Sequence, residues 1–233
     1  MHMSAIGIDI MSSRQRLYAF FGNSLLGAMT EETSIGLDPE FWEALVGGSL
    51  NGEYDTGLEN MIEAVMALSR CDRAKAVQMV AVDYTRLFVG PGKPAVPIWE
   101  TLYKNETGYT FGRQTLEVKQ VLHSQGLRLS GQSNQLEDHM GIELLLLSEM
   151  SRQTIDSCDA EGLIREQIAF IDEHPLSWVK PLRDCVRRAE RTGYYSALLT
   201  IIAGYLQYDI SVLRELSSSS HGISSPSSLT ISK

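Results

Sequence analysis

An Asp-His pair at Asp138 and His139 is the first place in the sequence where the residue types could support chemistry. Glu143 follows His139 by four residues, so on a helix these side chains would share one face and could in principle hold a metal ion. A metal site needs three or four ligands, and no His-x-x-x-His or Glu-x-x-His pair exists in the sequence to complete one. We therefore expect no metal site. We interpret Asp138 as a carboxylate in the first turn of a helix, where it favours the positive end of the helix dipole.

The segment Gly-Pro-Gly-Lys at residues 90–93 has the composition of a phosphate-binding loop but not its spacing. Pro94 stands where a Ser or Thr is required, and Leu87 stands where the first glycine should be. We therefore interpret the segment as a turn and expect no bound cofactor. The Ser, Cys and Lys side chains also lack a recognisable base partner nearby in sequence, so we expect no catalytic residues.

Apolar and aromatic residues flank this proline-rich loop on both sides. Core packing explains most clusters of this kind. Trp99 and Tyr103, however, lie next to an irregular segment, where amphipathic aromatic side chains often form the wall of a groove for a peptide. Both interpretations stay open for the flanking residues, which are Tyr84, Leu87, Phe88, Ile98, Trp99, Leu102 and Tyr103.

The composition excludes several classes of protein. The chain has 233 residues, 43% hydrophobic and 21% charged, which is typical of one substantial globular domain or two small ones. A formal net charge of −9 argues against nucleic acid as a partner and favours cationic ligands or peptides. No run approaches the roughly 18 apolar residues of a membrane span, so we expect no stable membrane insertion.

The cysteines indicate a reducing compartment, and the N-terminal segment does not have the pattern of a signal peptide. Cys71, Cys158 and Cys185 are odd in number and widely spaced, which predicts neither a disulfide framework nor a structural zinc site. Arg14 and Arg16 precede an apolar stretch, but the apolar positions there have the spacing of an amphipathic helix rather than of a signal peptide. We expect a cytoplasmic protein.

Helical periodicity dominates the sequence, and alternation with a period of two residues does not persist outside the loops. We predict an all-α protein with a single helical domain of about eight to ten helices, with a possible hinge near the proline loop or the 126–134 connector. We assign residues 1–12 to an N-terminal extension, 13–216 to the domain and 217–233 to a disordered Ser-rich tail. The predicted helices cover about 14–29, 39–46, 56–69, 73–88, 112–124, 134–154, 160–173, 176–191 and 194–216, with Asn134 as the cap of the sixth.

Two segments together resemble the TorD/DmsD (NarJ-like) family of molybdoenzyme maturation chaperones. The first reads Asp-Tyr-Thr-Arg-Leu-Phe-Val-Gly-Pro-Gly at 83–92, followed by Pro-Ile-Trp-Glu-Thr-Leu-Tyr at 97–103. The second reads Asn-Gln-Leu-Glu-Asp-His-Met-Gly at 134–141, similar to the family's Glu-Pro-x-Asp-His signature. Here Gln135-Leu136 replaces the Glu-Pro, while the Asp-His pair is intact. The resemblance extends over roughly residues 13 to 213.

The resemblance implies a cytoplasmic, all-helical chaperone rather than an enzyme. Such a chaperone binds the twin-arginine signal peptide of a molybdopterin oxidoreductase of the DMSO- or TMAO-reductase type. The chaperone itself is a monomer or a homodimer. It holds back the apo catalytic subunit until the cofactor is inserted. The peptide-binding residues so implied are Leu87, Phe88, Pro97, Ile98, Trp99 and Tyr103 in an apolar groove, with Asp138 and His139 at its polar end.

Two other functions remain open from the residues themselves. One is an all-α enzyme with titratable groups that converge only in space. The other is a helical regulatory or scaffold protein that binds a folded partner.

Overall fold

The computed structural model describes residues 4–46, 48–104, 111–129 and 135–219, and these form an all-α fold. Within this part of the chain there is no strand, only an isolated β-bridge between Trp99 and His139. The all-α prediction is confirmed. The elements are α1 (Ala5–Leu26), a 3-10 turn (Ser34–Leu37), α2 (Pro39–Val46), α3 (Gly52–Leu68), α4 (Arg73–Tyr84), a π-helical turn (Thr85–Val89), α5 (Thr101–Lys104), α6 (Arg113–Ser124), α7 (Met140–Asp156), α8 (Ala160–Glu173), α9 (Pro175–Ala189) and α10 (Tyr194–Ser219).

Most predicted helices are present, and the largest differences lie at their starts, although α1 also ends at Leu26 rather than at residue 29 and α4 ends at Tyr84 rather than at residue 88. The first helix begins at Ala5 rather than near Arg14, because the Ser4 side chain accepts a hydrogen bond from the Gly7 amide at 3.2 Å and caps it. Asn51 caps α3 in the same way, with 2.9 Å from the Tyr54 amide to its Oδ1, so that helix also begins earlier than predicted. Residues 5–12 therefore belong to a helix.

The start of α7 was predicted wrongly, and the short helix α5 was not predicted. The helix expected from about residue 134 begins at Met140, and its N-cap is His139; the proposed cap Asn134 lies outside the described residues. The one-turn helix α5 has too few residues to show a periodic pattern, so the sequence does not predict it. Of the Ser-rich tail, residues 217–219 extend α10 and residues 220–233 lie outside the described part.

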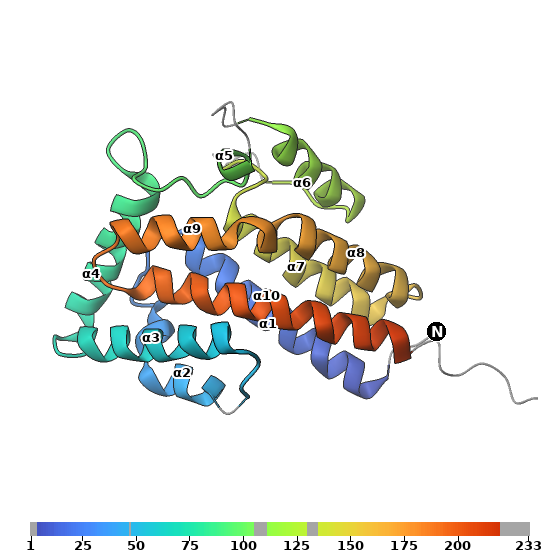
Figure 1. Ribbon diagram of the computed structural model, residues 1–233, viewed down its shortest axis with the longest axis horizontal. Coiled ribbons are helices and arrows are strands. Elements are labelled where there is room, and N and C mark those ends of the chain that lie inside the picture. The colour runs from blue at the N-terminus through green and yellow to red at the C-terminus, as the bar shows by residue number, and fades with distance from the viewer. Residues whose placement is uncertain (1–3, 47, 105–110, 130–134, 220–233) are drawn as a thin grey trace, which may run out of the picture.

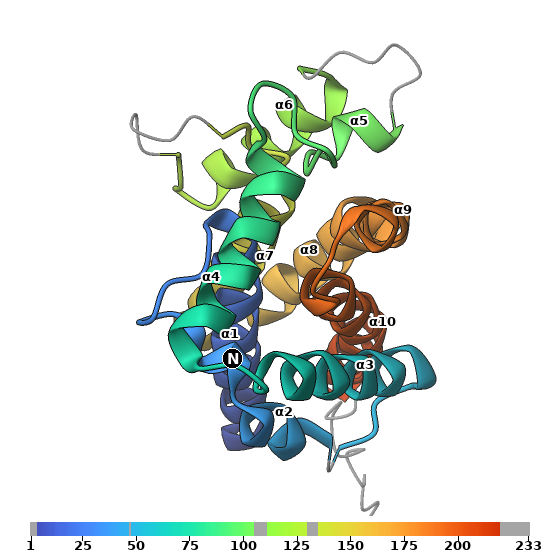
Figure 2. The ribbon, with the colours of Figure 1, turned by 90° about the vertical axis from the view of Figure 1, so that its left-hand side faces the viewer.

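The helices α1, α7, α8, α9 and α10 pack side by side, while α2 and α3 lie at one end of the molecule and α5 and α6 at the other (Figure 1). α1 packs along α7, and α10 packs against α3, α8 and α9. Figure 2 shows α4 running from the end that holds α2 and α3 towards the end that holds α5 and α6. The irregular loop after α4 leads to Trp99, which lies at the end of the bundle where α7 and α9 begin, because Trp99 pairs with His139 and its neighbour Glu100 contacts His174.

Glycines allow the closest helix crossings. A Cβ on Gly57 of α3 would lie 2.6 Å from the Ile201 backbone nitrogen of α10, and one on Gly204 of α10 would lie 2.4 Å from the Tyr54 nitrogen. Gly22 of α1 and Gly141 of α7 face each other in the same way, since a Cβ on either would lie 2.8 Å from the carbonyl oxygen of the other. These contacts fix how α1 and α7, and α3 and α10, approach each other.

A buried ion pair joins the first helix to the last. Arg14 of α1 donates to both carboxylate oxygens of Asp209 on α10, at 2.6 and 2.8 Å. Its remaining nitrogen donates to Ser151 of α7 at 3.0 Å and to Gln167 of α8 at 2.6 Å, and the Tyr18 hydroxyl donates to Asp209 at 2.6 Å. Arg14 and Asp209 are 2% and 1% exposed, so water cannot replace these partners.

Among the described residues one helix, α10, is long and apolar enough to cross a membrane by length and composition alone, with a mean hydropathy of 1.3. Of that window, 72% is buried inside the fold. A core helix of a soluble protein has the same properties, so this helix is weak evidence for a membrane span.

The glycine contacts lead to the first prediction. Gly57→Ala should lower the free energy of unfolding by about 1–3 kcal/mol, although alanine favours helices, because its Cβ meets the backbone of α10. Gly52→Ala in the same helix is the matched control, since a Cβ there has nothing within 4 Å. We expect this control to change stability by less than about 1 kcal/mol in urea unfolding. Equal effects of both substitutions would contradict the close crossing.

The second prediction concerns the buried ion pair. Asp209→Ala should cost about 3–5 kcal/mol of stability, because it leaves the Arg14 guanidinium buried without its counter-charge. The double variant Arg14→Met/Asp209→Leu should unfold at a higher urea concentration than Asp209→Ala, because it removes both charges. If the double variant is the less stable of the two, the pair is not the dominant interaction at this position.

Candidate functional site

The two motif segments of the sequence, one containing Trp99 and the other His139, are joined in space by backbone contacts. Trp99 and His139 form the isolated antiparallel bridge. The Glu100 amide donates to the Asp138 carbonyl oxygen at 2.9 Å, and the Met140 amide donates to the Ile98 carbonyl oxygen at 3.2 Å. Segment 98–101 thus lies against the residues that start α7. We call the residues around this junction the 99/139 site.

The Asp138 side chain holds the junction from inside. Its Oδ2 accepts a hydrogen bond of 2.9 Å from the Thr101 amide, at the start of α5. The Thr101 hydroxyl lies 3.2 Å from the Thr115 hydroxyl of α6, which extends the connection. Asp138 is fully buried and precedes α7, which corrects our placement of this residue in the first helical turn. Burial raises the pKa of Asp138, against the opposing effect of the Thr101 hydrogen bond.

His139 acts as the N-cap of α7. Its Nδ1 accepts a hydrogen bond of 3.0 Å from the Gly141 amide, so the ring needs an unprotonated Nδ1. The side chain is 1% exposed, and burial lowers the pKa of His139 to about 3. His139 is therefore neutral in the folded protein at physiological pH. The close contact between Gly22 and Gly141 keeps this helix start covered.

The aromatic side chains of the site are half-buried. The Trp99 ring lies across the His139 ring, with centroids 6.1 Å apart and an interplanar angle of 79°. The Tyr103 hydroxyl donates to the Pro97 carbonyl oxygen at 2.7 Å, and its ring packs 5.3 Å from that of Trp178. Pro97, Trp99 and Tyr103 are thus the predicted site residues with part of their surface accessible to a ligand.

Leu87 and Phe88 are placed differently from the other predicted site residues. Leu87 is fully buried and contacts the loop through its carbonyl oxygen, which accepts from the Val96 amide at 2.8 Å. The Phe88 ring packs 5.3 Å from Tyr84 and 5.5 Å from Tyr195. These two side chains belong to the core beneath the loop rather than to an accessible surface.

A polar centre that the sequence does not predict lies beneath the 99/139 site. Glu100 forms an ion pair with Lys104 at 2.6 Å and lies 2.8 Å from Nδ1 of His174, the residue between α8 and α9. Glu143 of α7 accepts a hydrogen bond of 3.0 Å from the Trp178 indole. Burial, with the neighbouring Glu100, raises the pKa of Glu143 well above its usual range.

Sequence reasoning did not assemble this centre, because its members come from three distant segments. Glu143 was considered only with Asp138 and His139, four residues away on the assumed helix. In the structure Glu143 accepts a hydrogen bond from Trp178, and its carboxylate lies near Glu100 and His174, with potential ligand atoms within 4.8 Å of one another. The signal that was present is the Glu100-Thr101 pair inside the first motif, which the resemblance highlighted without giving it a role.

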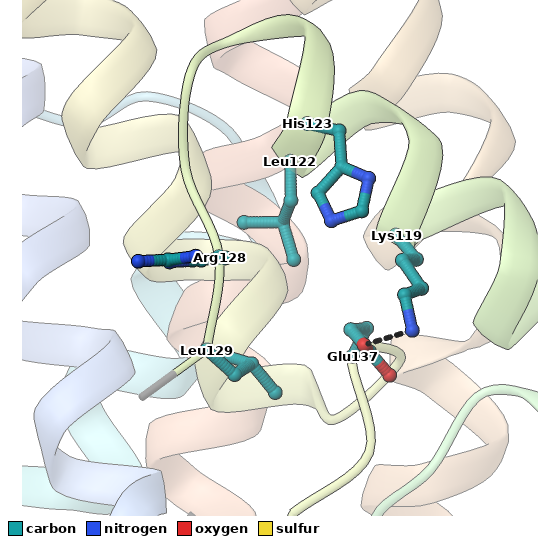
Figure 3. Close-up of a pocket in the computed structure, with 6 residues that line it drawn as sticks. All are labelled: Lys119, Leu122, His123, Arg128, Leu129 and Glu137. Atoms are coloured by element: carbon teal, nitrogen blue, oxygen red, sulfur yellow. Dashed lines mark ion pairs between the residues drawn. The ribbon is translucent and has the colours of Figure 1, made fainter. Parts of the chain in front are cut away.

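A small pocket lies between α6 with the residues that follow it and the segment before α7 (Figure 3). It has a volume of about 140 Å³. Figure 3 shows the Lys119 ammonium reaching across to Glu137, at 3.5 Å from its Oε1. His123 and Arg128 also line the pocket, so its positive charge does not suit an arginine ligand.

The neutral, buried state of His139 leads to a prediction about pH. The folded pKa of about 3 lies below the ordinary value of about 6.5, so the unfolded chain binds a proton first as pH falls. Stability should therefore decrease between pH 6.5 and pH 3, by about 2 kcal/mol from this residue at pH 5. His139→Asn keeps a capping side chain and removes the titration. Urea unfolding at pH 7 and pH 5 should show a smaller loss for this variant; an equal loss in both proteins would contradict a neutral His139.

Comparison with known proteins places the chain in a family. The family model described as nitrate reductase delta subunit matches residues 50–184, which is more than half of the chain. The chain is 25% identical to the chaperone protein TorD of Vibrio cholerae serotype O1 (strain M66-2), over 74% of this chain and 77% of that relative. It is 21% identical to the TorD chaperone of Photobacterium profundum, over 88% of this chain and 96% of that relative.

A further relative carries a different name. The probable Tat proofreading chaperone DmsD of Haemophilus influenzae is 25% identical over 56% of this chain and 60% of that relative. The named relatives are chaperones and not enzymes. The chain therefore belongs to the nitrate reductase delta subunit family, together with the TorD and DmsD chaperones, and is a chaperone rather than an enzyme.

Proposed function

We propose that this protein is a cytoplasmic chaperone that binds the twin-arginine signal peptide of a molybdopterin oxidoreductase at the 99/139 site. It retains the apo catalytic subunit until the cofactor is inserted and the enzyme is exported. The observation that carries this proposal is the bridge between Trp99 and His139, which makes one site of two segments that resemble the same family. The names of the TorD and DmsD relatives support the same class of client.

The site has an accessible layer and a buried layer. Pro97, Trp99 and Tyr103 offer half-buried apolar surface to the hydrophobic part of a signal peptide. Ile98, Asp138 and His139 lie beneath them and are at most 1% exposed, so their role in the proposal is to hold the aromatic layer in place.

The expected affinity suits a chaperone that must release its client. Burial of about three apolar peptide side chains contributes roughly 1.5–3 kcal/mol each, and ordering a flexible peptide offsets part of this. We expect a dissociation constant between about 1 μM and about 1 mM. Such a value permits binding during assembly and release afterwards.

The twin arginines need carboxylates that water and peptide can reach. Asp138 is too deeply buried for this role in the described conformation. Asp172 and Glu173 are exposed at the end of α8, and the carbonyl oxygen of Glu173 accepts a hydrogen bond from Lys104 of α5. We assign the contact with the arginines to this acidic end of α8, which agrees with the net charge of −9.

The accessible layer is tested with a fluorescent twin-arginine peptide. Trp99→Ala should weaken binding about 10- to 100-fold, and by the same factor at low and high salt, because the lost contribution is apolar burial. Met66→Ala on α3 is the control, since Met66 is an exposed apolar residue at 58% exposure away from the site. If folded Trp99→Ala binds like the parent, the peptide binds elsewhere.

The charged part of the site is tested by one double variant at the end of α8 and by two single variants of Asp138. Asp172→Asn/Glu173→Gln should weaken binding mainly at low ionic strength, since salt screens exposed charges. Asp138→Ala should weaken binding equally at both salt concentrations, because it removes the acceptor for the Thr101 amide, whereas Asp138→Asn retains an acceptor and should bind like the parent. A loss at low salt in Asp138→Asn, with none in Asp172→Asn/Glu173→Gln, would show that the Asp138 carboxylate meets an arginine directly and would contradict our assignment.

A further inference from the structure

The polar centre beneath the 99/139 site brings three potential metal ligands together. Glu100, Glu143 and His174 each offer one ligand atom, and these atoms lie within 4.8 Å of one another. The three residues come from the segment before α5, from the first turn of α7 and from the junction of α8 and α9. All three are buried, with exposures of 0%, 0% and 5%.

One carboxylate oxygen of this centre lacks a hydrogen-bond donor among the described residues. Glu143 Oε2 accepts the Trp178 indole N–H, whereas Oε1 is buried and receives no hydrogen bond from an N–H or hydroxyl donor among the described residues; its nearest polar neighbour is the Glu100 carboxyl group. A neighbouring buried oxygen, Oδ1 of Asp138, is in the same situation. An unsatisfied buried carboxylate oxygen is costly, so a ligand for Glu143 Oε1 would remove a large penalty.

The charges of the centre also favour a cation. Glu100 pairs with the ammonium group of Lys104 at 2.6 Å. Burial, helped by the nearby carboxyl groups of Glu100 and Asp138, raises the pKa of Glu143, and a cation would relieve the repulsion among these carboxylates. The Lys104 side chain is 28% exposed and can turn to solvent. It therefore marks the side from which an ion would enter and the group that it would displace.

The donor set indicates which class of ion fits. One imidazole nitrogen and two carboxylate oxygens suit Zn²⁺ or a similar divalent transition metal, whereas Mg²⁺ prefers oxygen ligands and retains its waters. Ligands on a tetrahedral Zn²⁺ lie about 3.3 Å from each other, which lies between the 2.8 Å that separates Glu100 from His174 Nδ1 and the 4.8 Å within which all three ligand atoms lie, so a small rearrangement suffices. The Trp178 N–H on Glu143 and the Phe170 ring, 4.8 Å from the His174 ring, would orient two of the ligands.

We propose that Glu100, Glu143 and His174 bind one divalent transition-metal ion such as Zn²⁺. The ion would clamp the segment that carries Trp99 and Tyr103 onto α7 and onto the start of α9. The site is distinct from the peptide-binding layer above it, so the metal proposal can fail without the signal-peptide proposal failing, and the reverse is also true.

The experiment titrates Zn²⁺ into the metal-free full chain by calorimetry, with Mg²⁺ in a parallel titration. We expect one Zn²⁺ per chain, no comparable binding of Mg²⁺, and a higher melting temperature with Zn²⁺. Glu143→Gln and His174→Asn should each weaken Zn²⁺ binding at least tenfold. Glu143→Gln retains an acceptor for Trp178 and removes a buried carboxylate, so this variant is expected to fold, which circular dichroism would check.

Matched controls separate this site from surface binding. His123→Asn and Cys158→Ser remove metal-binding side chains from the small pocket and from the exposed surface, and both should leave Zn²⁺ binding unchanged. If either control abolishes binding, or if Glu143→Gln and His174→Asn bind like the parent, the proposal is wrong.

A measurement on the unsubstituted protein covers the case in which the variants do not fold. Co²⁺ loaded into the chain should give weak visible absorption bands of a nitrogen and oxygen ligand set, and Zn²⁺ should displace it. An intense thiolate-to-metal band in the near ultraviolet would show a cysteine ligand instead and would overturn the assignment.

Discussion

The buried pair between Arg14 and Asp209 is the interaction on which the bundle depends. It joins the first helix to the last, and the other Arg14 nitrogen reaches α7 and α8 through Ser151 and Gln167. A guanidinium cannot be left unpaired in an apolar core, because the cost of desolvating its charge exceeds what packing returns. Four helices must therefore adopt one relative arrangement to satisfy a single side chain.

The 99/139 site is built on that arrangement. With α1 fixed, the contact between Gly22 and Gly141 sets where α7 begins, and His139 caps it there. The backbone just before this cap then receives the segment that follows the proline-rich loop, and Asp138 anchors α5 through the Thr101 amide. The Asp-His pair is thus a positioning device, and the accessible chemistry of the site is aromatic and apolar.

This separation of an accessible apolar layer from the buried polar groups beneath it suits a chaperone. Because most of the buried polar groups bond within the protein or are kept neutral, as His139 is, the accessible layer can bind an apolar peptide without a large electrostatic contribution from the groups beneath. The acidic side chains that remain at the surface, at the end of α8, are screened by solvent and contribute moderately. Moderate affinity is what permits a client to be held and then released.

The sequence by itself determined the all-α class, most helix positions and the two segments that matter. Local rules were enough there, because helical periodicity and the turn residues around 90–97 depend only on neighbours along the chain. The bounds of α2 and α8 were predicted to the residue, and those of α6 to within one residue. The starts of α1 and α3 were not, because Ser4 and Asn51 act as caps ahead of the apolar pattern that was used to find the helices.

Only the tertiary structure decided what the motif residues do. Asp138 and His139 were expected at the polar end of a groove, yet both are buried, because segment 98–101 folds over them. Phe88 was expected beside Trp99, but its ring packs with Tyr84 and Tyr195. The convergence of Glu100, Glu143 and His174 joins residues more than 30 positions apart, and no local pattern encodes such a contact, since it arises from the packing of whole helices against one another.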